Sequence, residues 1–259
     1  MPIITIASNK GGVAKTTTAI AIAHGLTLYH LQHAQNLAKA QVRLLDTDRQ
    51  GHCATILGLD PEPGAFDYFI SRRPLPDLLR ATGRDGLSLL PSNSRTETAE
   101  RVLMAEGAVT DVQVLLRQLA TTVAYLVIDT PPRGFLQEQA IRVADIIICP
   151  TRPEHLAVDG LAQTVAMISG LHQESPGHAR LCILPTCFDS RLREHIDNWN
   201  LLKETWPMQT LNCIPQRIAV AETSSAGLTI WESKARGIED VQAAYGSLLN
   251  WITGEKVWS

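Results

Sequence analysis

Short, almost wholly apolar runs alternate with longer stretches of helical periodicity along the 259 residues of the chain. Apolar runs of this kind, bounded by turn-forming residues, are typical of strands that are buried on both faces of a sheet. Their alternation with helices predicts an α/β fold, a doubly wound, mostly parallel sheet with helices on both faces. The expected strands are Ile3–Ala7, Val42–Leu45, Leu87–Leu90, Tyr125–Ile128, Ile146–Cys149, Leu181–Leu184 and Thr210–Cys213. The expected helices are Thr16–Leu31, Thr110–Thr121, Val158–Leu171, Arg191–Trp206 and Ile238–Ile252.

The chain shows no internal division. No Pro-, Gly- or Ser-rich linker separates two regions and no repeat is visible, so residues 1–259 are predicted to form one domain. Polar and Pro-rich segments follow several expected strands, among them DTDRQG from residue 46, DTPPRG from residue 129 and IPQR from residue 214. Ligands of open α/β sheets bind outside the carboxyl ends of the strands. The binding site is therefore expected at that edge of the sheet.

Composition and charge narrow the class of protein. The hydrophobic content is 45% and the net charge is −3, so the chain has no global basic field, and a nucleic-acid surface would have to be a local patch. The five cysteines form no C-x-x-C pair and no zinc-type spacing, which predicts reduced thiols rather than disulfides. No signal peptide is visible, and no apolar run approaches the ~20 residues of a membrane span, which predicts a cytoplasmic protein.

The segment SNKGGVAKTTT, residues 8–18, lies between the first expected strand and the first expected helix. It does not match the usual phosphate-loop pattern G-x-x-x-x-G-K-[ST], because the two glycine positions fall on Asn9 and Ala14. Gly11 and Gly12 nevertheless allow the backbone to approach a phosphate closely, and Ala14 is tolerable if its φ is negative. The N-terminus of the following helix adds partial positive charge. The context predicts a phosphate-binding loop.

Side chains at the end of this segment suit a nucleotide and its metal ion. Lys15 can reach the β- and γ-phosphates, and the hydroxyl of Thr16 can coordinate Mg²⁺. The loop residues predicted to bind the nucleotide are Gly11, Gly12, Val13, Ala14, Lys15, Thr16 and Thr17.

A second lysine, Lys10, precedes the glycines and would be redundant in a self-contained site. The run K-G-G-x-x-K-T-T resembles the deviant Walker A box of the ParA/MinD superfamily. In that family the early lysine reaches across a dimer interface to the nucleotide held by the partner subunit. The resemblance implies a P-loop ATPase that forms a homodimer with ATP sandwiched at the interface, with Lys10 and Lys15 as catalytic residues.

Two further segments resemble boxes of the same family. LLDTDRQGHCATILG, from residue 44, resembles the pattern D-x-D-P-Q-x-x-A-T, which implies that Asp46 lies near the metal and that Asp48 positions the attacking water. A carboxylate at position 48 is also suited to capping the next helix. Arg49 replaces the common proline, and Gln50 marks the motif. YLVIDTPPRG, from residue 125, resembles the Walker B strand and its switch, which implies that Asp129 lies in the outer Mg²⁺ shell.

Later segments extend the resemblance along nearly the whole chain. ADIIICPTRPEHLAVDGL, from residue 144, resembles the next strand and helix of the family. CIPQRIAVAETSSAGLTIWE, from residue 213, resembles the I-P-x-R segment that borders the adenine, which implies nucleotide contacts for Pro215 and Arg217. Arg217 has the alternative of serving the dimer interface. No helix-turn-helix segment precedes the phosphate loop, so the resemblance is to a ParA-type partition ATPase without that domain.

The spacing between the first two boxes departs from the family. Lys15 and Asp46 are further apart than expected, and the extra length falls in LYHLQHAQN, residues 28–36. His30 and His33 have the i,i+3 spacing of helical metal ligands, and His24 precedes them. A lengthened, solvated helix end is the favoured interpretation.

Within this family a weak, partner-stimulated ATPase acts as a timer. ATP closes the dimer, the dimer binds nucleoid DNA or membrane, and a ParB-like partner triggers hydrolysis and release. The resemblance implies ATP and Mg²⁺ as cofactors and a role in segregating or positioning plasmid, chromosome or protein cargo. From Asp240 onward, Lys256 is the only lysine or arginine, which is unlike a basic amphipathic membrane anchor. Trp251 is expected to pack against the domain.

Non-specific DNA is therefore favoured over the MinD-like membrane-associated alternative. The side chains predicted to grip phosphates, each of which has the alternative of an ordinary surface charge, are Arg191, Arg193, Lys234 and Arg236.

Two other classes share parts of the pattern. A redox enzyme resembling the nitrogenase iron protein needs a cysteine just after the Walker B strand and another upstream, and neither DTPPRGFLQ nor residues 92–128 contain one. A nucleotide-switched metal or cluster carrier lacks support because no C-x-x-C pair is present. The favoured interpretation is a cytoplasmic, nucleoid-associated partition ATPase.

Overall fold

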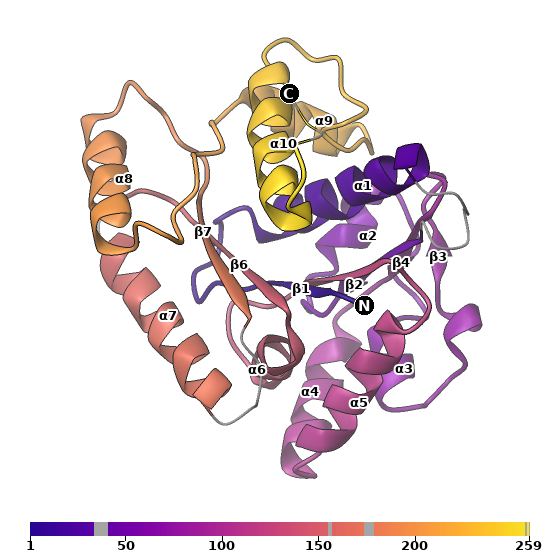
Figure 1. Ribbon diagram of the computed structural model, residues 1–259. Coiled ribbons are helices and arrows are strands. Elements are labelled where there is room, and N and C mark those ends of the chain that lie inside the picture. Colours follow the sequence, from indigo (N-terminus) through magenta and orange to yellow (C-terminus); the bar gives the residue numbers. More distant parts are fainter. Residues whose placement is uncertain (34–40, 155–156, 174–178, 257, 259) are drawn as a thin grey trace.

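The computed structural model describes residues 1–33, 41–154, 157–173, 179–256 and 258 of the chain (Figure 1). Its centre is a seven-stranded sheet with the strand order β3-β4-β2-β5-β1-β6-β7. All neighbouring strands pair in parallel except β3, which runs antiparallel to β4 at one edge. The predicted mostly parallel sheet is confirmed. The strands are β1 Ile3–Ile6, β2 Val42–Asp46, β3 Arg80–Ala81, β4 Leu87–Leu90, β5 Tyr125–Asp129, β6 Ile146–Thr151 and β7 Arg180–Pro185.

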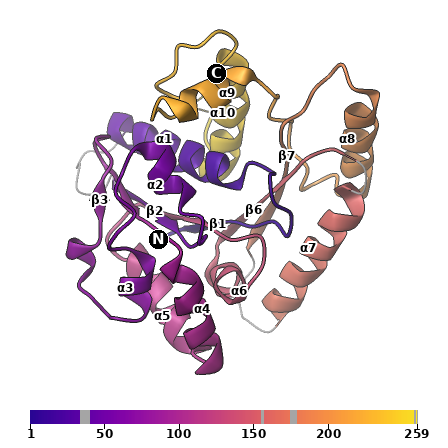
Figure 2. The same cartoon turned by 180° about the vertical axis from the view of Figure 1, so that it is seen from behind.

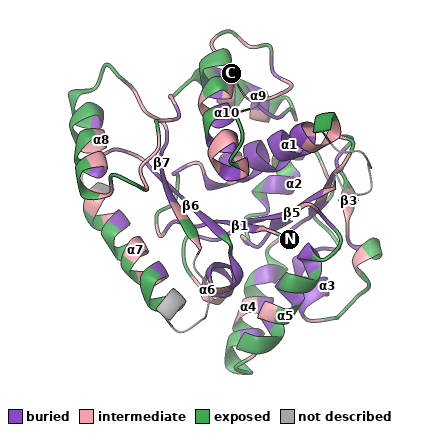
Figure 3. Ribbon diagram, in the orientation of Figure 1, coloured by how far each residue is buried: buried purple, intermediate pink, exposed green. Residues whose placement is uncertain are grey.

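Helices cover both faces of this sheet, as Figures 1 and 2 show from opposite sides. The helices α1, α2, α9 and α10 pack on one face, and α3 to α8 pack on the other. The strands between them are largely buried (Figure 3), which explains their continuous apolar runs. The helices are α1 Lys15–His33, α2 His52–Leu57, α3 Ala65–Phe69, the 3-10 helix η2 Leu75–Asp77, α4 Arg95–Ala105, α5 Val109–Ala120, α6 Phe135–Val143, α7 Ala157–Gln173, α8 Arg193–Thr205, α9 Ile218–Ser225 and α10 Glu239–Thr253.

The register of the central strands brings two carboxylates together. Asp46 at the end of β2 is paired with Asp129 at the end of β5, and Ile6 of β1 is paired with Asp129 from the other side. The carboxyl ends of parallel strands meet at one edge of the sheet. The segments that follow β1, β2 and β5 therefore surround a common site.

The last expected strand, Thr210–Cys213, is wrong. Thr210 pairs with Ile183 of β7 in an isolated bridge only. Two residues further along β7, Pro185 has no N–H to donate, and its carbonyl accepts from Ile214, one residue beyond the position that a regular ladder requires. The ladder therefore stops after one pair. The elements that the pattern did not predict are β3, α2, α3, η2, α4, α6 and α9.

The structure also bears on the expectations about the histidines, the cysteines and membrane-spanning segments. His33 stacks on Tyr29 in the last turn of α1, and His24 is buried with its Nδ1 2.6 Å from Thr229 Oγ1, so the lengthened helix is confirmed. The group of three potential metal ligands found among the described residues, Asp46, Cys53 and Asp129, includes none of these histidines. Residues 34–36 lie outside the described residues. All five cysteines are free thiols, as predicted. Within the described ranges, no helix combines the length and the apolar character needed to cross a bilayer.

Candidate nucleotide-binding site

The loop between β1 and α1 is anchored on both sides. The carbonyl of buried Val13 accepts a hydrogen bond from the hydroxyl of Thr186, at 3.0 Å, and the carbonyl of Ala14 accepts the N–H of Thr18 in the first turn of α1. Between these anchors the chain has to reverse, and Ala14 has φ 62°. The expectation of a negative φ at Ala14 is wrong. The left-handed conformation of a non-glycine residue costs roughly 1–2 kcal/mol, so the loop carries strain here.

The two glycines of the loop face open space. A Cβ atom built on Gly11 or Gly12 would meet nothing within 4 Å, and Gly12 has φ 70°. The loop residues line a cavity of about 410 Å³ together with Asp48, Arg49 and Gln50. The first turn of α1 points its free N–H groups toward this space, where a helix N-terminus favours an anion. The geometry suits a phosphate group.

Lys15 lies at the base of the loop. It is 8% exposed, and its Nζ donates to the carbonyl of Lys10 at 2.9 Å, so the side chain closes the loop on itself. Burial lowers the pKa of Lys15, while the nearby carboxylates of Asp129 and Asp48 act in the opposite direction. A bound anion would add negative charge near the buried ammonium group and so offset part of its desolvation.

Asp129 and Thr16 join the sheet to the loop. The hydroxyl of Thr16 donates to Asp129 Oδ2 at 2.7 Å, and the thiol of Cys53 lies 3.6 Å from the same oxygen. The other oxygen, Asp129 Oδ1, is buried and has no hydrogen-bond partner. Burial raises the pKa of Asp129 to about 6. A buried carboxylate with an unsatisfied oxygen is costly by itself, and a cation is the natural partner for it.

Asp46 acts on the backbone of the next segment. Its two carboxylate oxygens accept the N–H groups of Asp48, at 2.9 Å, and of Cys53, at 3.1 Å. Burial, followed by the charge of Asp129, raises the pKa of Asp46 well above its usual range. Asp46, Cys53 and Asp129 form a group of ligand atoms within 4.8 Å of one another. The structure thus brings the three predicted metal-site residues, Thr16, Asp46 and Asp129, to one place.

Asp48 lies at the mouth of the site. It is half-buried and borders the cavity that the phosphate loop lines. Its Oδ1 accepts the N–H of Gln50 at 3.0 Å, in the turn before α2, but the N-cap of α2 is Gly51 and no side chain of the described residues caps this helix. The alternative role of Asp48 as a helix cap is therefore wrong, and its place at the mouth of the cavity is compatible with the catalytic interpretation.

Lys10 lies against its own chain in this structure. A Cβ atom on Gly160 of α7 would lie 2.4 Å from Lys10 Cε, so the glycine makes room for the lysine side chain. The motif VDGL contains this glycine, but the sequence gives no sign of what it contacts.

A second cavity, of about 270 Å³, adjoins the loop through Ala14 and Thr17. The predicted residues Pro215 and Arg217 line it, and Arg217 forms an ion pair with Asp240. Its lining combines aliphatic side chains with the polar groups of Gln216, Arg217 and Tyr245, as is usual for sites that bind small molecules. Other lining residues that the motifs did not reveal are Thr186, Cys187, Val220, Val241 and Tyr245.

Residues 1–180 match the family model described as an AAA domain. Over 250 residues the chain is 30% identical to the chromosome partitioning protein ParA of Myxococcus xanthus, an alignment that covers 93% of this chain and 85% of that protein. The chain belongs to the ParA family of P-loop ATPases.

Solved structures share this ParA fold. An ATP complex of McdA from Cyanothece superposes with a TM-score of 0.83 at 21% identity, covering 99% of this chain and 97% of that one. Cobyrinic acid a,c-diamide synthase from Mycobacterium smegmatis, with bound ADP and magnesium, superposes with a TM-score of 0.76 at 26% identity, again covering 99% and 97%.

The basic residues predicted to contact DNA lie on two separate segments of this ParA-family chain. Arg191 and Arg193 lie where the chain enters α8, whereas Lys234 and Arg236 precede α10, and Figure 1 shows these segments apart. Arg191 pairs with Asp189 at 2.7 Å and Arg193 with Asp197 at 3.6 Å. The structure does not gather the four side chains into one patch on a single chain. In its described part, it pairs neither Lys234 nor Arg236 with a carboxylate, and both are exposed.

Proposed function

We propose that this protein is a ParA-type ATPase whose ATP-bound homodimer binds DNA without sequence preference and is released by partner-stimulated hydrolysis. The observation that carries the proposal is Asp129 Oδ1, which is buried without a partner beside the hydroxyl of Thr16, under an open phosphate loop. On this proposal, residues 1–259 act as one ATPase domain, and its cargo is a plasmid, a chromosome or a protein body.

The proposed cofactors are ATP and Mg²⁺. Oxygen ligands from a hydroxyl and carboxylates suit Mg²⁺, which is a hard cation, and a relative of 26% identity has ADP and magnesium bound. Thr16 and Asp129 hold the ion, directly or through its waters, and Asp46 fixes the backbone of the neighbouring turn. When bound, Mg²⁺ neutralises charge on the β- and γ-phosphates.

The remaining proposed roles belong to the loop and its surroundings. The residues from Gly11 to Thr17 bind the phosphates through backbone N–H groups, and Lys15 contributes its charge to the β- and γ-phosphates. Asp48, at the mouth of the cavity, orients the attacking water. Pro215 and Arg217 border the base in the adjoining cavity.

Lys10 is proposed to act on the partner subunit. Its contact with Gly160 places it at the exposed rim of the loop, so it can leave its own α7 and approach a second nucleotide site when two chains face each other. A ParB-like protein is the proposed partner that accelerates hydrolysis in this dimer.

DNA is proposed as the surface because the C-terminal segment does not present its aromatic side chains to a membrane. The ring of Trp258 packs on Trp231 with centroids 4.7 Å apart, and the guanidinium of Arg180 lies 4.2 Å from the ring centroid of Trp251. These contacts support the expected packing of Trp251. On this proposal the protein is cytoplasmic and nucleoid-associated.

The test is binding of the purified protein to a non-specific DNA duplex with ATP, with ADP or without nucleotide. Asp48→Ala, which is expected to bind ATP without turnover, holds the ATP state during a gel-shift measurement. The proposal predicts that DNA is bound with ATP only, whatever its sequence, and that salt removes it. Co-sedimentation with anionic liposomes under the same conditions tests the MinD-like alternative. Binding to liposomes but not DNA would overturn the proposed surface.

A further inference from the structure

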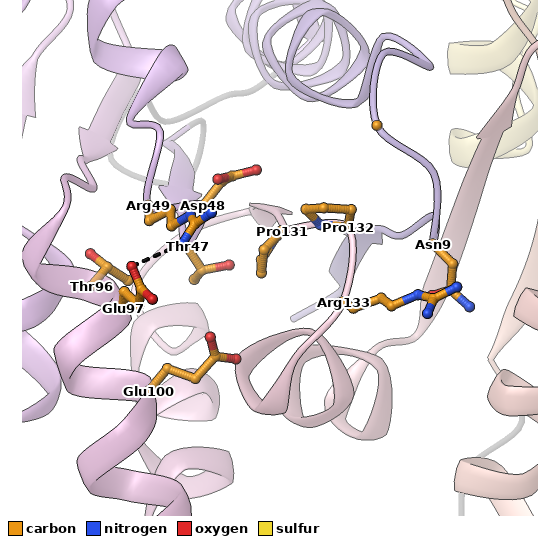
Figure 4. Close-up of a pocket in the computed structure, with 11 residues that line it drawn as sticks. Asn9, Thr47, Asp48, Arg49, Thr96, Glu97, Glu100, Pro131, Pro132 and Arg133 are labelled. Atoms are coloured by element: carbon orange, nitrogen blue, oxygen red, sulfur yellow. Dashed lines mark hydrogen bonds and ion pairs between the residues drawn. The ribbon is translucent and has the colours of Figure 1, made fainter.

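Arg49 directly follows Asp48, at the position where the resembling family commonly has proline. Its Nη1 donates to Glu97 Oε2 of α4 at 2.9 Å, as the dashed line in Figure 4 shows. A proline at this position has neither a charge nor a side-chain donor. The positive charge of Arg49 therefore lies next to the proposed catalytic carboxylate of Asp48, and a chain with proline at this position lacks it.

Arg49 borders two neighbouring cavities. One, of about 370 Å³, is also lined by Glu97 and Arg133, and the other, of about 410 Å³, is lined by the phosphate loop with Gly12 and Lys15. In Figure 4, Arg49 and Glu97 lie on one side of the first cavity, and Arg133 lies on the opposite side. Rotation of the Arg49 side chain would therefore move its guanidinium group away from the Glu97 carboxylate and into the cavity that the phosphate loop lines.

The ion pair that holds Arg49 is weak. The two side chains are 56% and 48% exposed, so water competes for both charges, and exposed pairs of this kind contribute little. A terminal phosphate carries more charge than one carboxylate and offers oxygen atoms to which a guanidinium group binds in bidentate fashion. A nucleotide in the loop is thus a better partner for Arg49 than Glu97.

We propose that Arg49 is a catalytic arginine supplied within the same chain, held on Glu97 without nucleotide and turned onto the γ-phosphate when ATP is bound. The inference rests on the proposed ATPase function. Glu97 is a positioning residue, because it limits how often the guanidinium group is available.

Arg49 acts while the γ-phosphate is transferred to water. The water oxygen forms a bond to the γ-phosphorus while the bond between this phosphorus and the β,γ-bridging oxygen breaks. The electron pair of that bond stays on ADP, one proton of the water remains on the released phosphate and the other passes to solvent. Arg49 neutralises the charge on the γ-phosphate oxygens during this transfer, together with Lys15.

A purely structural role of the Arg49–Glu97 ion pair predicts different effects of the two single variants on the rate. If the ion pair only ties the turn after β2 to α4, Arg49→Ala and Glu97→Gln break the same tie and change the rate in the same direction. A catalytic arginine that Glu97 holds back gives opposite signs, because one variant removes the cation and the other releases it. The sign of the two effects therefore separates the two roles.

The experiment measures kcat for ATP hydrolysis by the full chain as wild type, Arg49→Ala, Glu97→Gln and the double variant. Arg49→Ala is expected to lower kcat by about tenfold or more, and Glu97→Gln to raise it by up to about fivefold, the limit set by an exposed ion pair. The double variant is expected to behave like Arg49→Ala. Arg101→Ala on α4 is the control, because Arg101 is exposed and lines neither cavity.

Binding of nucleotides adds a second readout. Arg49→Ala is expected to leave the affinity for ADP unchanged and to weaken the complex with ADP and aluminium fluoride, which mimics the transferring phosphate. If Arg49→Ala does not fold, Arg49→Lys keeps the charge without the bidentate geometry and is expected to lower kcat.

Three outcomes overturn the inference. Rates that fall together in both single variants, or rates that do not change, overturn it while the ATPase function stands. A wild-type protein that binds no ATP overturns the inference and the proposed function together.

Discussion

The hydroxyl of Thr16 donates a hydrogen bond to Asp129 Oδ2 at 2.7 Å, and this bond links the first turn of α1 to the end of β5. This hydrogen bond satisfies one oxygen of a carboxylate whose other oxygen is buried without a partner. On the proposed function, a bound cation would satisfy this second oxygen.

Asp129→Asn should separate stability from cation binding. The amide removes a buried carboxylate for which the cost of burial outweighs the hydrogen bond of Thr16 and the charge of Lys15, so the nucleotide-free protein is expected to become more stable by about 1 kcal/mol, or about 3 °C in melting temperature. Dependence of ADP binding on Mg²⁺ is expected to be lost. Calorimetric melting and ADP titrations with and without Mg²⁺ measure the two effects. A lower melting temperature with Mg²⁺ dependence intact would contradict this account of Asp129.

The pKa of Asp129 predicts a pH dependence. Because its folded pKa is raised to about 6, above that of the unfolded chain, the folded state binds the proton more tightly. The contribution of this group to stability is therefore largest at low pH and is lost as pH rises toward 6. The charged form binds the cation, so the increase in melting temperature caused by Mg²⁺ and ADP should grow as pH rises through 6. An increase that is equal at pH 5 and pH 8 would argue against Asp129 as the titrating ligand.

Ala14 offers a test of the strained loop. Ala14→Gly removes the cost of a side chain at φ 62° but adds the entropy of a glycine in the unfolded chain, so a net gain of about 0.5 kcal/mol is expected. Ala14→Val, which places a β-branched residue in the same conformation, should lower stability. Urea unfolding of the two variants compares them. Similar losses in both would mean that the conformation at position 14 is not strained.

Gly160→Ala should release Lys10 from α7. The new Cβ would lie 2.4 Å from Lys10 Cε, at the flexible end of the side chain, so the lysine moves rather than the helix. If Lys10 acts on the partner, its release is expected to strengthen the ATP-dependent dimer a few-fold. Gly170→Ala is the matched control on the same helix, since its Cβ meets nothing within 4 Å. Dissociation constants that respond equally in both variants would indicate a helix-propensity effect alone.

The basic segments should differ in their contribution to DNA binding. Arg191 and Arg193 are paired with carboxylates, so a phosphate has to displace Asp189 and Asp197. Lys234→Glu with Arg236→Glu is therefore expected to weaken DNA binding more than Arg191→Glu with Arg193→Glu, and to reduce the salt dependence by about two phosphate contacts. Titrations at several salt concentrations measure both. The reverse order would place the DNA surface at α8.

Much of the fold and of the phosphate site follows from local patterns. The resemblance to the family's motifs implied that Asp46 and Asp129 share one metal site, and the register of β2 and β5 brings the two residues together at one edge of the sheet. The φ of Ala14 was beyond prediction because contacts of Val13 and Thr18 set it, and one of these reaches Thr186 in a distant segment.

Other features depend on side chains that carry no local signal. Glu97 lies on α4, whose mostly polar sequence RTETAERVLMA gives little periodicity, so the partner of Arg49 could not be predicted. Tyr245 of α10 lines the cavity of about 270 Å³, and its hydroxyl lies 2.9 Å from that of Thr18. The predicted strand Thr210–Cys213 does not extend beyond one bridge, because Pro185 of the adjacent strand β7 has no N–H to donate.

The mass of Asp48→Ala in solution, measured by light scattering with Mg²⁺ and ATP, with Mg²⁺ and ADP, and without nucleotide, shows whether two copies of the chain complete the site. The account predicts the 28.3 kDa monomer without nucleotide or with ADP, and a doubled mass with ATP that Lys10→Ala lowers again. A mass that stays at 28.3 kDa while ATP is bound would contradict a site that two copies complete.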